Sequence, residues 1–139
     1  MDDNDICSVG AVFFAKKDNK YYLYNSAGTL ISDGFDDAKL FVSNQPAAVK
    51  IGSKWGYVSV TGEIVIEPQY SDANSFNKDL APVESKNKKG KWGCIDINNE
   101  IVIEPEFDYM GSFMNNGYAE IENEDTGKSQ KYITIKSYE

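Results

Sequence analysis

A repeat of 37 residues is the feature that most restricts how this chain can fold. Residues 54–60 read Lys-Trp-Gly-Tyr-Val-Ser-Val, and residues 91–97 read Lys-Trp-Gly-Cys-Ile-Asp-Ile. Residues 63–70 and 100–107 both read Glu-Ile-Val-Ile-Glu-Pro, followed by a polar residue and an aromatic residue. Repeats of this length bury their apolar faces against their neighbours, so the chain is predicted to be one repeat domain.

Less regular copies flank these two. In residues 20–24, Lys-Tyr-Tyr-Leu-Tyr takes the place of the Lys-Trp-Gly segment. Atypical terminal units are expected in a stacked array. The predicted organisation is a single domain over 1–139, made of a partial unit at 1–19, a decayed repeat at 20–53, repeats at 54–90 and 91–130, and a terminal strand at 131–139.

The periodicity inside each copy is that of β-structure. Side chains alternate between two faces along 91–97, and Thr61-Gly62 is typical of a tight turn before a β-branched run. Proline lacks a ladder donor, so the Glu-Pro pair is expected to end that run. The predicted fold is all-β, with three-stranded antiparallel meanders stacked as an incomplete propeller or a short curved solenoid. The meanders are expected near residues 11–33, 46–68 and 80–105, with a final hairpin at 118–135.

The segments between the meanders, near 34–45, 69–79 and 106–117, carry an aromatic residue at each end. They are long for unstructured loops, so we expect turns pinned by these aromatics, with room for one short helix at 36–41. The glycine after each tryptophan is expected where a large ring from a neighbouring unit lies over bare backbone.

Composition excludes several classes of function. The chain has no histidine, which removes the Ser-His-Asp triad and every zinc site that contains histidine. Its 22 acidic and 14 basic side chains give a net charge of −8, which disfavours a nucleic-acid partner and favours a basic protein. The acidic N-terminus lacks the features of a signal peptide, and no apolar stretch is long enough to cross a bilayer. We therefore expect a cytoplasmic protein without a membrane partner.

The candidate reactive groups favour a protein that is not an enzyme. Cys7 and Cys94 form no CxxC motif and are predicted to be free thiols, with Cys94 buried in a strand. Glu67 and Glu104 occupy equivalent places in two copies, so architecture explains them better than an acid–base role. The acidic residues at 122–125 lack the spacing of a calcium loop. No catalytic residue, metal site or cofactor is predicted.

The repeated Lys-Trp-Gly strand, the Ile-Val-Ile-Glu-Pro segment and the aromatic-to-alanine closing segment resemble the WG β-repeat family of bacterial proteins. The resemblance is strong over 54–123 and weak over 20–50, where Tyr21-Tyr22 replaces Trp-Gly and Asp33-Gly34 replaces Glu-Pro. It implies short-stranded β architecture and no catalytic residue or cofactor. A shared fold does not establish a shared function.

We expect a non-catalytic protein-binding domain, best described as an immunity or antitoxin-type protein that neutralises a basic toxin or nuclease. The alternative is a repeat module that recognises a peptide or a cell-envelope component. Specificity is expected in the segments between the meanders, because loops on a rigid scaffold commonly carry binding. Aligned positions there form a predicted acidic ridge of Asp36, Asp37, Asp72, Asp108 and Tyr109, which Asp79 and Glu106 could extend. The competing interpretation is that these acids cap turns through their own backbone.

Overall fold

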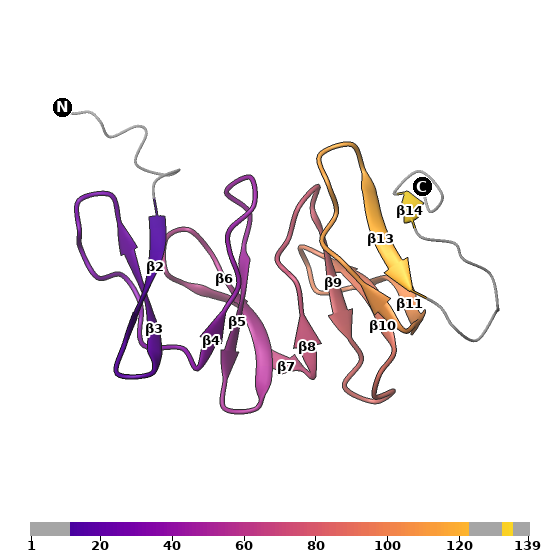
Figure 1. Ribbon diagram of the computed structural model, residues 1–139, viewed down its shortest axis with the longest axis horizontal. Helices are drawn as coiled ribbons and strands as arrows, with labels where there is room; N and C mark the ends of the chain where they lie inside the picture. Colours follow the sequence, from indigo (N-terminus) through magenta and orange to yellow (C-terminus); the bar gives the residue numbers. More distant parts are fainter. Residues whose placement is uncertain (1–11, 123–131, 135–139) are drawn as a thin grey trace.

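The computed structural model describes residues 12–122 and 132–134, and this part of the chain is all-β, with no helix. The described strands form four antiparallel sheets, which follow one another in chain order (Figure 1). The strands are β2 (Val12–Lys17) and β3 (Lys20–Asn25) in the first sheet; β4 (Asp37–Ala38), β5 (Ala47–Ile51), β6 (Lys54–Val58) and β7 (Ile64–Tyr70) in the second; β8 (Asp72–Ala73), β9 (Leu80–Glu84), β10 (Trp92–Asp96) and β11 (Ile101–Phe107) in the third; and β12 (Tyr109–Met110), β13 (Tyr118–Glu122) and β14 (Tyr132–Thr134) in the fourth.

The predicted meanders are present in both regular repeats. Strands β5, β6 and β7 pair in sequence order, and so do β9, β10 and β11. Each of these sheets gains a short fourth strand, β4 or β8, from the segment that precedes it. The helix allowed for at 36–41 is therefore wrong, because residues 37–38 pair with β5 instead. The described strands do not close into a barrel.

The expectation that Glu-Pro ends the Ile-Val-Ile strand is also wrong. Strands β7 and β11 continue through Pro68 and Pro105 to the following aromatic residue. The register against β6 and β10 shifts along the way, as in a β-bulge, so the strand bends instead of stopping. Both strands lie at the edge of their sheets, where a residue without an N–H donor is tolerated.

The glycine after each tryptophan allows two backbones to approach closely. A Cβ atom at Gly56 would lie 2.4 Å from the carbonyl oxygen of Ile66, and one at Gly93 would lie 2.1 Å from that of Ile103. The neighbour is thus the bulged backbone of the adjacent strand. The ring from a neighbouring unit that the sequence suggested is not what excludes a side chain here.

The apolar core lies between and within the sheets. Trp55 and Trp92 are each 5% exposed, so both tryptophans are buried. One buried cluster surrounds Trp55 and includes Tyr57 and Phe76, and a second surrounds Trp92 and includes Met110. A third cluster is formed by the N-terminal sheet and the start of the next one.

Two matching junctions between units are filled in different ways. In the first junction, the large Tyr57 and the small Ala73 share one buried cluster, and the Tyr57 hydroxyl donates to the carbonyl oxygen of Asn74 at 2.8 Å. In the second, the aligned residues are the small Cys94 and the large Met110, which share the next cluster. The large side chain comes from the Trp-Gly strand in the first junction and from the following segment in the second. The total volume of the two side chains therefore stays similar.

This exchange predicts non-additive effects on stability. Cys94→Tyr alone is expected to overpack the second junction and lower the free energy of unfolding by about 1–3 kcal/mol. Adding Met110→Ala should recover most of that loss, although Met110→Ala alone should cost about 2–5 kcal/mol. Urea denaturation of the two single variants and the double variant measures the coupling. Simple addition of the two losses would contradict the exchange.

Burial also governs the chemistry of Cys94, which is a free cysteine. Burial raises the pKa of its thiol from 9.0 to about 12. We expect Cys94 to react slowly with a thiol reagent at pH 8 and rapidly after unfolding. In the unfolded chain the thiol loses its proton near pH 9, whereas the folded chain keeps it, so stability should fall as the pH rises from about 9 towards 12. Rapid labelling of Cys94 in the folded chain would contradict the expected slow reaction. The prediction that Cys7 is a free thiol concerns a residue outside the described part of the chain.

Candidate functional site

The segments that carry the predicted ridge lie side by side in successive units. The Asn74 side chain donates to the carbonyl oxygen of Met110 at 2.9 Å, and the Asn77 side chain donates to that of Phe113 at 2.6 Å. The Ser112 hydroxyl donates to the carbonyl oxygen of Ser75 at 3.4 Å. These contacts join the second and third segments, and a hydrogen bond from the Lys39 ammonium to the Asn74 side chain joins the first segment to the second.

Three ridge carboxylates are paired with lysines of the same chain. The Lys20 ammonium lies 2.6 Å from Asp36, and the Lys91 ammonium lies 2.8 Å from Asp108, at matching places in two units. The hydrogen bonds from Lys20 and from the Gly52 backbone N–H hold the pKa of the Asp36 carboxyl below its ordinary value. These pairs reduce the negative charge that the ridge offers to a partner.

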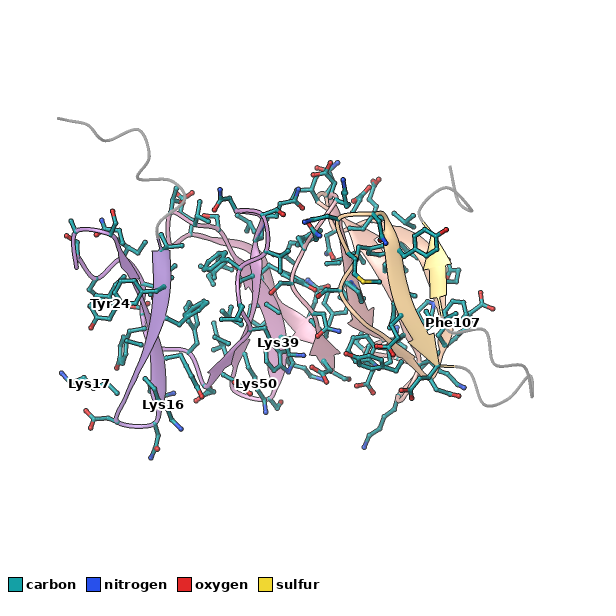
Figure 2. All side chains as sticks on the ribbon, turned by 45° about the horizontal axis from the view of Figure 1, so that its top comes forward. Lys16, Lys17, Tyr24, Lys39, Lys50 and Phe107 are labelled. Carbon is teal, nitrogen blue, oxygen red and sulfur yellow. The ribbon has the colours of Figure 1, made fainter. Side chains whose placement is uncertain are left out.

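The third pair spans two units. Lys39 lies near the middle of the molecule in Figure 2, and its ammonium is 3.3 Å from Asp72 and 2.9 Å from the Asn74 side-chain oxygen. The same ammonium lies 4.9 Å from the centre of the Trp55 ring, within the range of a cation–π contact. Lys39 thus contributes to the junction between units as well as neutralising Asp72.

Several ridge residues serve local structure. Asp37 and Asp72 each accept a hydrogen bond from the backbone N–H of the next residue at 2.8 Å, within the short strands β4 and β8. The bond of an Asx turn reaches the residue two positions on, so these two contacts are not turn caps. Asp79 and the Gln45 side chain exchange two hydrogen bonds. Tyr109 packs edge-on against Trp92 with ring centres 5.0 Å apart. Glu106 lies on the edge strand β11, where it is exposed.

A second acidic surface lies on the outer face of β7 and β11, and Glu106 is its one residue that the sequence had pointed to as a binding residue. Exposed residues alternate with buried or half-buried ones over residues 64–68 of β7 and over residues 102–107 of β11. The outer face of β11 carries Val102, Glu104 and Glu106, and Glu100 lies just before the strand. We call these four residues the β11 row. Glu63, Val65 and Glu67 occupy matching places at β7. Among the residues that the structure describes, none of these glutamates forms an ion pair.

A pocket of about 190 Å³ lies on the opposite face of β11. Its apolar wall includes Ile101, Ile103 and Pro105 of β11, and Tyr70 from the end of β7 forms part of the rim. The Tyr70 hydroxyl is hydrogen-bonded to the Asn99 side chain. Polar groups of the loop after β9 also line it, and one of them, the Lys86 ammonium, donates to Gln69 at 3.0 Å.

The described residues offer no further chemistry that points to a cofactor. Within 12–122 and 132–134, no group of three or more cysteine or acidic side chains is placed to hold a metal ion. No helix in this part of the chain is long and apolar enough to span a membrane. The features that distinguish the surface are the glutamates on the outer faces of β7 and β11 and the pocket beside β11.

These observations define an antiparallel β-repeat protein whose units stack through their Trp-Gly strands. Comparison with protein families gives a match to the WG-containing repeat at residues 55–89 and 92–126, which together make just over half of the chain. The chain belongs to the WG-containing repeat family. No curated protein and no solved structure matches it.

Proposed function

We propose that this chain is a non-catalytic module that binds a basic protein in the cytoplasm. The observation that carries the proposal is the row of exposed glutamates on β11, repeated at β7 and unmatched by lysines among the described residues. The net charge of −8 acts in the same direction. Carboxylates on an open surface attract a cationic partner over distance and raise the rate of association.

Within this class, the function we prefer is that of an immunity or antitoxin-type protein, which neutralises a basic toxin or nuclease. A rigid β-scaffold with an unneutralised acidic face is suited to covering the cationic surface with which a nuclease holds its substrate. The specific partner is part of the proposal, and family membership supports only the more general role of a repeat module.

The test begins with a tagged chain purified from its native host. We expect it to retain one basic protein of comparable size. Expression of that protein alone should stop growth, and co-expression of this chain should restore it. A captured protein that is acidic would contradict the basic partner, and a basic partner without toxicity would contradict the neutralising role.

Association kinetics with that partner should separate the two acidic surfaces. Because its carboxylates are not paired, the β11 row is expected to dominate, and Glu100→Gln with Glu104→Gln should lower the association rate about fivefold at low salt. Changing Asp36, Asp37, Asp72 and Asp108 to Asn should have a smaller effect, since three of these acids already face lysines. Stopped-flow fluorescence at two salt concentrations measures both variants, with circular dichroism to check the fold. A larger effect of the ridge variant would show that the ridge is the interface.

A further inference from the structure

Among the residues that the structure describes, one edge of strand β11 is paired with no other strand. It is the last strand of its sheet, and its ladder is formed with β10 alone among the described strands. Its residues include exposed apolar side chains, with Ile101 55% and Val102 37% exposed. The unpaired N–H and C=O groups along the edge of a strand are a template for pairing with another extended chain.

The two faces of this edge differ in chemistry. One face carries the glutamates of the β11 row, and the other opens onto the pocket beside Ile101, Ile103 and Pro105. A strand added along β11 would direct successive side chains to these two faces in turn. Side chains on one face of paired strands lie about 4.5–5.5 Å apart, which is within reach of an ion pair between long side chains.

From this arrangement we infer that β11 accepts an extended segment of the partner protein in which basic and apolar residues alternate. The backbone of the segment pairs with the free edge of β11. Its lysines or arginines face the β11 row, and its apolar side chains enter the pocket. Backbone pairing supplies affinity in this mode of recognition, while the alternating side chains supply specificity. The inference rests on the proposed function, because the basic partner provides the segment.

Strand β7 shows why the site is confined to β11. Ile64, which matches Ile101 in the repeat, packs against the N-terminal cluster of Leu23 and Phe35. The turn before β7 also packs against the N-terminal part of the chain, because a Cβ atom at Gly62 would lie 2.0 Å from the Ile31 carbonyl oxygen. The acidic row at β7 therefore lies beside a filled face, whereas the β11 row lies beside an open pocket. This difference makes the β7 glutamates a matched control.

The experiment uses three synthetic peptides on the full chain. In the first, lysine and valine alternate; in the second, the same residues are grouped by type; in the third, glutamate replaces lysine. Fluorescence anisotropy gives the affinities, and NMR amide shifts locate the binding. We expect the alternating peptide to bind at least about tenfold more tightly than the grouped peptide and to shift the amide signals of residues 101–104 and 106. The glutamate peptide should not bind.

Variants then test each face of the edge. Glu100→Gln with Glu104→Gln should weaken binding of the alternating peptide about fivefold, whereas the control Glu63→Gln with Glu67→Gln should leave it unchanged. Ile101→Lys places a charge at the mouth of the pocket and should weaken binding about tenfold. Because Ile101 is 55% exposed, this variant is expected to fold.

Several results would overturn the inference. Equal binding of the alternating and grouped peptides would show attraction by charge without strand pairing, and equal effects of the β7 and β11 variants would show that the pocket is not used. A dimer in sedimentation that Ile101→Lys dissociates would show that a second copy occupies the edge. A basic native partner that binds the β11 variants as well as the parent would remove this site and leave the proposed function intact. Peptide binding at β11 without a basic partner in the host would support the site and remove the proposed function.

Discussion

Replacing Trp92 with alanine is expected to lower the free energy of unfolding by about 3–5 kcal/mol, the usual cost of removing a large core side chain. Trp92 is 5% exposed and lies in a cluster with Phe107, Met110 and Phe113. Its ring also packs against Tyr109, so the change affects both sides of the junction between units. A thermal or urea melt followed by circular dichroism measures the loss.

The control for this prediction is Ile97→Ala, which removes an apolar side chain that is 46% exposed just beyond the same strand. Its effect should stay within about 0.5 kcal/mol, because surface substitutions away from packed contacts have small effects. If Trp92→Ala and Ile97→Ala prove equally stable, the tryptophan is not a structural anchor of the repeat.

The second large effect is expected at Gly93. A Cβ atom there would lie 2.1 Å from the carbonyl oxygen of Ile103 and 2.9 Å from the nitrogen of Pro105. Both are backbone atoms of a bulged strand, so they cannot move as the end of a side chain would. Gly93→Ala should therefore lower the free energy of unfolding by about 3 kcal/mol, at the upper end of the usual cost of overpacking.

Gly111→Ala provides the matched control, because the nearest atom to a Cβ there is 3.7 Å away. That substitution should be neutral or slightly stabilising, since alanine restricts the unfolded chain more than glycine does. Both variants are compared by urea denaturation. A Gly93→Ala variant as stable as Gly111→Ala would mean that the bulge of β11 moves aside readily.

The sequence predicted the strands more reliably than their ends. Alternation and the tight turns identify β6, β7, β10 and β11, because both signals are local. Proline was expected to end β7, yet the strand continues, since a missing donor matters little at a sheet edge. Whether a strand lies at an edge depends on the whole sheet. The role of Gly93 could not be predicted from the local sequence either, because the atom that excludes a side chain there belongs to the next strand.

The candidate site shows a similar division. Alignment of the copies predicted that the ridge acids follow one another along the stack, and this row stays a prediction. Hydrogen bonds join the second and third of the segments that carry these acids. The lysines opposite Asp36, Asp72 and Asp108 were not predicted, since they lie 16 to 33 residues away in the sequence. Glu67 and Glu104 were attributed to architecture because they repeat. Their side chains are exposed, and the architectural interpretation stays a prediction.

The hydrogen bonds between successive segments affect how such an array can change during evolution. Asn74 and Asn77 donate from their side chains, but they bind the carbonyl oxygens of Met110 and Phe113. Every amino acid supplies that acceptor, so the receiving unit can drift in sequence without losing the link. Duplication of a unit would also create a compatible acceptor at once. Inheritance of the donor side chain is then sufficient to keep the units joined while their exposed surfaces diverge towards new partners.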